Sequence, residues 1–565
     1  MKEEKLEIST DELNDISVNV KNMIEIRKNF DNYNQNISKY FSTLYLDFGN
    51  DIVENSGSGT KNKRDIVPYT SSDERASSLI FPYVDNFVSF FMDLLVSPGN
   101  NWLEIEIGLM SDANGMPKEN LKNNDEINNY LDLVKNCLLE FLDGCNFYKI
   151  FGLAVSDAVN YGYGCMMMDI KDKMPKLKYA VLTECYYDMD MYGDINIFVR
   201  KFNMTEKEMK DFFDADKIQY FLSDMKSKSP SVSNEYTIIQ YIQKGYFDDG
   251  ESLSVYFAYG CDTEKSILKI EKISYDNFFV VRWDQKGGFA YPEGQSLKIL
   301  EEVINLNHIA QSDRALMKDS FMASYGYHDK GFDNIDPGNL YQGYFVKYSD
   351  RVARNPELGK INRLLPEINP QKPMLNYEII ISAIQKVFFA DYVQLRGGTK
   401  TATEVLRLNA DMTRVLQPRV SQIYNETVQP ILSAILDSLM KSGKIPDLDT
   451  VGLKEVKFVF LSEVDLSNRD GQKNDLSQMG AALAQYRDIT GSPVFSMSID
   501  PYKTLDKIKK LYRADRTNFR NKEEIEEELK QMAERQDVAE QAQLAKVMSE
   551  AERNNASAIK DTSNL

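Results

Sequence analysis

The longest amphipathic run of the chain, from Thr401 to Leu439, places the strongest constraint on its fold. Its apolar side chains recur at helical spacing, at Val405, Leu408, Met412, Val415, Leu416, Ile423, Val428, Ile431, Leu432, Ile435, Leu436 and Leu439. This spacing predicts one helix with a single apolar face, about 60 Å long at 1.5 Å per residue. Pro418 and Pro430 remove backbone donors and predict kinks. Because the chain has 565 residues, we expect this helix to belong to a multi-domain protein.

The segment before this helix combines paired glycines with cations. Its residues are Arg396, Gly397, Gly398, Thr399 and Lys400. The glycines permit hinge motion, and the two cations can contact phosphates. Thr401 and Glu404 then form the S/T-x-x-E pattern, in which hydroxyl and carboxylate bond to first-turn amides, so the long helix is predicted to begin here.

Three interpretations of this loop are open. The Lys-Thr pair before a helix is superficially similar to a phosphate-binding loop, but the glycine directly before the lysine and the one five residues earlier are missing. An ordinary surface loop is the second interpretation. A channel-lining loop near DNA is the third, and it depends on the family resemblance given below.

Two upstream helices bracket an irregular insertion. Apolar residues at helical spacing cover residues 297–322 and 375–393. Between them, residues 326–374 contain five prolines and short strand-like pieces. The predicted order is therefore helix, insertion, helix, glycine loop and long kinked helix.

The rest of the chain mixes helices with a β-rich part. Helical spacing marks residues 1–45, 123–158, 472–486 and 501–512, and a further helix is expected at 205–221. Strand-like alternation marks residues 178–182, 195–199, 236–241, 254–257 and 456–461. The predicted fold class is α+β, predominantly helical.

The best candidate for a membrane span, residues 78–96, is interrupted by Pro82, Asp85, Asn86 and Asp93. A bilayer penalises these residues, so this segment is predicted to be a core helix. The acidic N-terminus lacks the apolar part of a signal peptide, and five dispersed cysteines fit a reducing compartment. We expect synthesis in the cytoplasm.

The charge balance restricts how the chain can meet DNA. Lys and Arg number 67 against 86 Asp and Glu, a formal net charge of −19. That sign argues against wrapping DNA by broad phosphate neutralisation. Any DNA contact is therefore expected to be local or weak.

Candidates for catalysis and metal binding are few. Asp188, Asp190 and Asp194 could suggest an acidic metal site, although carboxylates are common in a glycine-containing turn. His308 and His328 are the two histidines of the chain, which is too few for a His-rich metal site or a convincing Ser-His-Asp arrangement. The sequence predicts no enzyme activity, no metal and no cofactor.

Two further residue sets are candidates for binding. The first set lies in the insertion and comprises Asp329, Lys330, Phe332, Asp333 and Tyr344. Aromatic side chains among charged ones favour contacts with a partner protein. Arg407 and Arg414 follow Lys400 at intervals of seven, near one face of the long helix. A DNA track, an intersubunit row of salt bridges and a solvated helix face are alternatives for these cations. An ordinary turn-rich surface is the alternative for the insertion.

This order of elements resembles the portal (head-to-tail connector) proteins of short-tailed, podovirus-type bacteriophages. The most specific stretch is residues 400–405 with the long helix and residues 444–448 after it, and the likeness extends from Ser77 to Tyr512. It implies the phage portal fold, with wing, stem, clip, tunnel loop and helical crown. The wing would comprise 1–294 completed by 402–465, the stem 295–325 with 375–395, the clip 326–374, the tunnel loop 396–401 and the crown 466–550, with a disordered tail at 551–565.

The resemblance also implies a function and partners. The chain would be a structural ring subunit, in a homo-oligomer of twelve at the capsid vertex of the virion, forming the channel for packaging and ejection of double-stranded DNA. Its partners would be the terminase large subunit, tail adaptor and nozzle proteins, major capsid and scaffolding proteins, and internal core proteins. Twelve copies at −19 each carry −228 formal charges, so DNA would slide through an acidic lumen and meet cations mainly at the tunnel loop.

Two other functions compete with this one. A DNA-packaging or recombination enzyme needs a complete Walker loop with an acidic strand partner, which the sequence lacks. A cytoplasmic scaffold or coiled-coil adaptor is favoured by the highly charged residues 521–553. Such a scaffold would have no role on DNA.

Overall fold

The fold is described from a computed structural model of the protein. The described residues are 8–42, 44–48, 67–68, 77–98, 102–108, 125–171, 174–215, 217–218, 221, 235–247, 250–259, 267–321, 325–326, 362–363, 371–390, 402–448, 453, 455–460, 476–482, 484–485, 504, 525, 528, 530–532, 534–535 and 541–551. The chain divides into two compact units, Met1–Ser462 and Glu463–Leu565. In the second unit, residues 476–482 and 541–551 are helical. All elements and sites below lie in the first.

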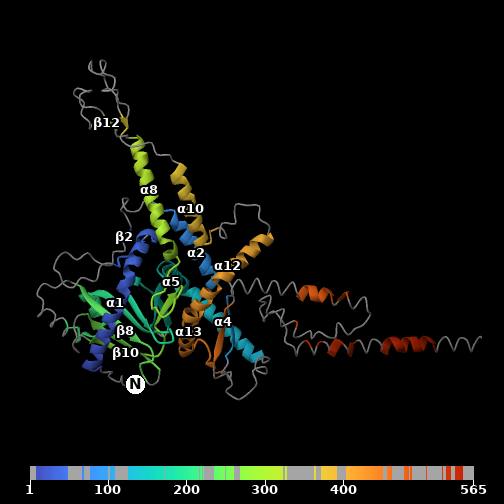
Figure 1. The fold of residues 1–565 in the computed structure, drawn as a ribbon. Helices are drawn as coiled ribbons and strands as arrows, with labels where there is room; N and C mark the ends of the chain where they lie inside the picture. The colour runs from blue at the N-terminus through green and yellow to red at the C-terminus, as the bar shows by residue number, and fades with distance from the viewer. Residues whose placement is uncertain are drawn as a thin grey trace, which may run out of the picture. The chain divides into compact units, whose positions relative to one another are not determined.

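A five-stranded antiparallel sheet forms much of the β-rich part (Figure 1). Its strands are β6 (Cys185–Met189), β7 (Ile195–Thr205), β8 (Glu235–Gln243), β9 (Ser252–Ala258) and β10 (Ile267–Ile273), in the order β10-β9-β8-β7-β6. Strand alternation predicted β7, β8 and β9. The short β6 and the lysine-rich β10 give a weaker pattern and were not predicted.

Helices cover both faces of this sheet, which explains why apolar residues occur at consecutive positions of its central strands. On one face, α1 (Thr10–Phe41) packs Leu13 and Val20 against Tyr241. On the other face, Met209 of α6 (Glu206–Phe212) packs against Ile238. The predicted helix at 205–221 begins as expected, with a capping box from Thr205, but it is interrupted: α6 ends at Phe212, and helical residues recur at 215, 217–218 and 221.

A second sheet lies in the largest core. Strands β4 (Tyr163–Lys171), β5 (Met174–Ala180) and β11 (Phe278–Arg282) are antiparallel in the order β11-β4-β5. Helix α5 (Phe147–Tyr161) packs on them so closely that a Cβ on Gly164 would lie 1.9 Å from the carbonyl oxygen of Ala154. A glycine is required at this point because the two backbones touch.

The remaining elements of this core are α2 (Ile80–Leu95), α4 (Asp125–Gly144), a turn of 3-10 helix η1 (Leu182–Glu184), and two short pairings. These pairings are β3 (Leu103–Ile107) with β14 (Val456–Phe460), and β1 (Leu44–Tyr45) with β2 (Val67–Pro68). The prediction that residues 78–96 form a core helix is confirmed by the burial of α2. Within the described part of the chain, no helix has the length and apolar character to cross a membrane.

A two-helix arm projects from this core (Figure 1). It consists of α8 (Leu300–Phe321), preceded by the 3-10 turn η3 (Ser296–Ile299), and α10 (Gln371–Val387), which packs along α8. Beyond α8, β12 (Tyr325–Gly326) pairs with β13 (Asn362–Arg363). Both helices were predicted, with boundaries that differ by a few residues.

The long helix forms as predicted, but its irregularity differs from the expected kinks. It consists of α12 (Ala402–Ile423), a π-helical turn η8 (Tyr424–Val428) and α13 (Gln429–Lys441). Helix α12 continues through Pro418, whereas the π-turn directly precedes Pro430. Because Pro430 has no N–H for the carbonyl of Glu426, a wider turn at this point avoids a clash, and the N–H of Gln429 bonds to the carbonyl of Tyr424.

Candidate functional site

Most of the predicted site residues lie outside the described part of the chain. They are the loop residues Arg396, Gly397, Gly398, Thr399, Lys400 and Thr401, and the insertion residues Asp329, Lys330, Phe332, Asp333 and Tyr344. Glu404 and Arg407 lie within α12, where only the backbone is described. Arg414 is described and is exposed on α12. These assignments therefore stay predictions.

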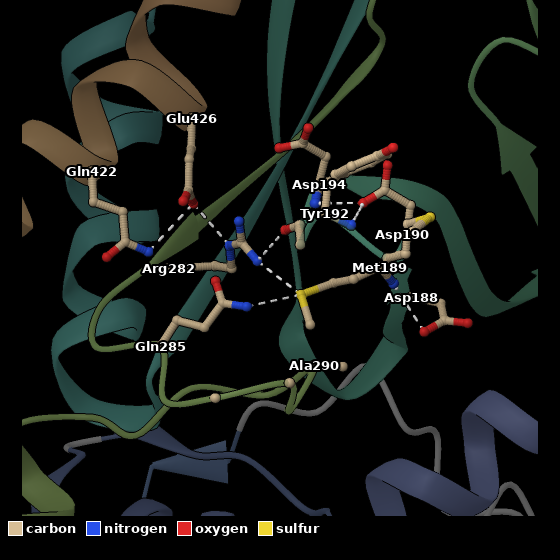
Figure 2. Close-up of a pocket in the computed structure, with 14 residues that line it drawn as sticks. Asp188, Met189, Asp190, Tyr192, Asp194, Arg282, Gln285, Ala290, Gln422 and Glu426 are labelled. Carbon is tan, nitrogen blue, oxygen red and sulfur yellow. Dashed lines mark hydrogen bonds and ion pairs between the residues drawn. The ribbon is translucent and has the colours of Figure 1, made fainter.

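The structure instead defines a polar pocket where three segments of the first unit meet (Figure 2). Its volume is about 530 Å³. One wall is the β6–β7 hairpin, residues 188–194. A second is the loop after β11, with Gln285, Gly287, Gly288 and Ala290, and the third is the long helix, with Gln422 and Glu426.

The tip of the β6–β7 hairpin is shaped by one carboxylate. Oδ1 of Asp190 accepts hydrogen bonds from the backbone N–H groups of Tyr192 at 2.8 Å and Asp194 at 2.9 Å. Gly193 completes the turn with a φ of 89°, in the left-handed region that favours glycine. The acidic run thus serves as turn chemistry, and the described residues hold no group of three side chains that could bind a metal ion.

Arg282 joins the three walls. Its side chain is 97% buried; its Nε donates to Oε2 of Glu426 at 2.8 Å, and its Nη1 donates to the carbonyl of Gly193 at 3.0 Å and to Sδ of Met189 at 2.9 Å. Figure 2 shows the guanidinium between the helix and the hairpin. A buried arginine at the end of a strand, held by a helix 144 residues later, fixes the hairpin relative to the π-turn.

The pocket is acidic and its rim is apolar. Four carboxylates (Asp188, Asp190, Asp194 and Glu426) face one guanidinium, a net formal charge of −3. Three large side chains are unusually exposed beside it: Met191 at 87%, Tyr192 at 82% and Phe289 at 68%. Exposed Met and aromatic side chains around a polar cavity are typical of a protein contact surface.

A second polar cluster joins the base of the arm to α12. Oδ2 of Asp284 accepts from Lys298 of η3 at 2.9 Å and from Arg419 of α12 at 3.1 Å. Burial raises the pKa of Asp284, but the hydrogen bonds from the two cations outweigh it, and the net pKa lies below the usual value. The carboxylate therefore stays ionised and bridges the two helical segments.

The same junction holds the other helix of the arm. Nε2 of Gln295 donates to the carbonyl of Val387, the last residue of α10, at 2.8 Å, and Nε1 of Trp283 donates to Oε1 of Gln295 at 3.3 Å. Trp283 is fully buried against Phe87 and Phe91 of α2. The short segment 280–284 thus contacts the long helix directly, and it is linked through Lys298 to the turn before α8 and through Gln295 to the end of α10.

Sequence reasoning missed this junction because every contact in it joins residues distant along the chain. The one local signal was Arg282-Trp283-Asp284, a charged and aromatic triplet that begins at the last residue of the otherwise apolar strand β11. A buried arginine there requires an anionic partner, but its identity cannot be read from spacing.

Comparisons with known proteins identify the family of this chain. A family model described as "Bacteriophage head to tail connecting protein" matches residues 14–517. A "Probable portal protein" of Bordetella phage BPP-1 is 23% identical over 276 residues, which span 46% of this chain and 47% of that protein. The chain thus aligns with about half the length of this relative.

A chain of a solved structure, the "Virion of native gene transfer agent (GTA) particle", is 10% identical to this chain. The alignment covers 73% of this chain and 89% of that one. Its TM-score of 0.35 is too low to carry a structural argument. The family match, by contrast, extends from α1 into the second unit, and it confirms the resemblance predicted from the order of helices. The chain belongs to the bacteriophage head-to-tail connecting protein family.

Proposed function

We propose that the chain is the portal subunit of a short-tailed bacteriophage. Twelve copies would form a ring at the capsid vertex of the virion that conducts double-stranded DNA during packaging and ejection and has no catalytic role. Family membership and the portal-like relative support this proposal. The observation that carries it is the arrangement of α8, α10 and α12, two arm helices and a long helix joined at one polar junction.

The proposed parts of the portal follow one another along the chain. The arm would be the stem, and residues 326–374 beyond it would be the clip, which docks the terminase large subunit and later the tail adaptor proteins. Residues 388–401 connect α10 to α12 and would include the tunnel loop. Here Arg396 and Lys400 would contact phosphates briefly, while the net charge of −19 per subunit keeps DNA from binding tightly elsewhere.

Electron microscopy of the purified full-length chain tests the assembly. We expect closed rings with a central channel, because a heterologous contact between identical subunits closes on itself when the rotation fits. Monomers or open filaments at all protein concentrations would contradict a portal and favour a scaffold.

Replacing Arg396 and Lys400 with alanine tests the loop. We expect rings to form normally but the length or retention of packaged DNA to change, whereas Lys149→Ala, at an exposed cation of α5, should change neither. Packaging and retention identical to the parent would remove the loop assignment. ATP hydrolysis by the purified chain that Lys400→Ala abolishes would instead favour an enzyme.

A further inference from the structure

We propose that the acidic pocket at the β6–β7 hairpin is one half of the contact between neighbouring copies of this chain, and that it receives Arg414 of the next copy. This inference rests on the proposed function, since it assumes a ring. It adds the residues that would make the subunits adhere.

The pocket has the chemistry of a receptor for a cationic side chain. It carries a net charge of −3, and Arg282 at its wall is already paired with Glu426. Asp194 is exposed, and among the described residues no side chain bonds to its carboxylate, whereas the neighbouring Asp190 is committed to the hairpin turn. Asp194 is therefore the carboxylate best placed to accept an incoming guanidinium.

The rim supplies the apolar part of a protein contact. Met191 and Tyr192 stand on the hairpin and Phe289 on the opposite loop, all at least 68% exposed. A flexible thioether and two aromatic rings around a charged centre resemble the central residues of protein interfaces, where apolar contact excludes water from an ion pair. A small ion or a free cation would make no use of these side chains.

Arg414 is the matching cation on the same unit. It is exposed on α12 beside Val415, which is 55% exposed, and it forms no ion pair with any described residue. Arg414 lies eight residues before Gln422 and twelve before Glu426 along the long helix, about 12 and 18 Å away along its axis. That separation keeps Arg414 out of its own pocket, so it is available to a neighbouring copy.

Charge explains why such a pair is needed. Each copy carries −19, so two copies repel unless local cations meet local anions. Because every copy has both the pocket and the arginine, the contact is heterologous, and it repeats around a ring without a free end. An arginine suits this role because its planar fork can pair with a carboxylate while it stacks on an aromatic rim.

A charge swap tests the pairing in the full-length chain. Asp194→Arg and Arg414→Asp should each raise the protein concentration at half assembly, measured by mass photometry, by at least about tenfold, as close charge pairs at interfaces do. The double variant should return to within about threefold of the parent because the pair is restored with opposite polarity. Lys207→Asp, at an exposed cation on α6, makes the same change in net charge as Arg414→Asp and should have little effect.

Disulfide trapping provides a second measurement. Asp194→Cys combined with Arg414→Cys should give a ladder of cross-linked multimers under copper phenanthroline, which takes up the two electrons as two thiols become one disulfide and two protons. Either single cysteine variant should give no ladder. The pairing would be overturned if the single charge variants assembled like the parent. It would also be overturned if the double charge variant assembled no better than the single variants and the double cysteine variant gave no ladder. Either result would leave the proposed ring intact. A parent chain that never assembles would overturn the proposed function as well.

Discussion

Breaking the ion pair between Arg282 and Glu426 should lower the free energy of unfolding of the first unit more than breaking an ion pair at the surface does. Arg282 is 97% buried and Glu426 has 27% of its side chain exposed, with 2.8 Å between the charged atoms. Glu426→Gln keeps the size of the side chain and an acceptor oxygen but removes its charge, which leaves a buried guanidinium without its carboxylate partner, beside neutral acceptors such as the carbonyl of Gly193 and Met189.

The expected cost follows from that burial. Removing one partner of a buried pair costs about 3–5 kcal/mol, and the partial exposure of Glu426 places this variant near the lower value, about 3 kcal/mol. The matched control is Lys210→Ala, because Lys210 and Glu206 form a pair of similar length, 2.7 Å, with side chains 57% and 37% exposed. That substitution should cost no more than about 1 kcal/mol.

Urea unfolding followed by tryptophan fluorescence measures the difference. Trp283 directly follows Arg282 and packs in the core against Phe91, with 4.6 Å between ring centroids, so its emission reports on this region. A free energy of unfolding for Glu426→Gln that matches the Lys210→Ala control would refute the reasoning. Replacing both partners with apolar residues, Arg282→Met with Glu426→Leu, should cost less than Glu426→Gln alone, because no unpaired charge remains buried.

Three further predictions concern the core. Gly164→Ala should destabilise the protein by at least about 3 kcal/mol because the new Cβ meets a backbone carbonyl 1.9 Å away, whereas Gly144→Ala, with no atom within 4 Å, should be nearly neutral in thermal unfolding. Burial raises the pKa of Asp157 to about 7, so its protonated carboxyl stabilises the fold at low pH. This contribution is lost as the pH rises from about 4, the ordinary pKa of an aspartate, to about 7. Asp157→Asn, which can still accept from Tyr179, should remove the fall in melting temperature between about pH 4 and 7. Thr427→Val should cost about 1–2 kcal/mol in urea unfolding, because its hydroxyl donates to a buried carbonyl of β11 at 3.0 Å.

Each of these has a clear contrary result. A Gly164→Ala protein as stable as the Gly144→Ala control would mean that α5 and β4 separate without cost. An unchanged pH profile for Asp157→Asn would assign the dependence to another group. A neutral Thr427→Val would show that the π-turn needs no tether to β11.

The sequence predicted the elements of this fold better than their contacts. Helices such as α8, α10 and the long helix repeat apolar residues over many turns, so their periodicity is evident without tertiary information. Strands β4 and β11 were missed because both are buried on two faces and read as continuous apolar runs rather than as alternation. The break after α6 at Phe212 was also missed, since the apolar pattern continues past it and helical residues recur at 215, 217–218 and 221.

The junction illustrates why site prediction was less successful. Nothing in the local sequence around Asp284 indicates that Lys298 and Arg419 will meet there, since the first follows 14 and the second 135 residues later. Short-range patterns such as the capping box at Thr205 were readable because both partners lie within one helical turn. The loop residues around Lys400 and the insertion residues around Phe332 stay predictions.

The π-turn before Pro430 sets the direction in which the side chains of α12 project relative to those of α13. A π-turn holds one more residue than the α-helical turn it replaces, so deleting a residue from Tyr424–Val428 would rotate α12 by about 100° relative to α13 and draw it in by about 1.5 Å. Arg419 would then leave Asp284, and Arg414 would face a different direction. Pro430 disfavours a regular α-helix at this point, so a single ring without an N–H sets the direction in which Arg414, the residue proposed to meet the next copy, projects from the long helix.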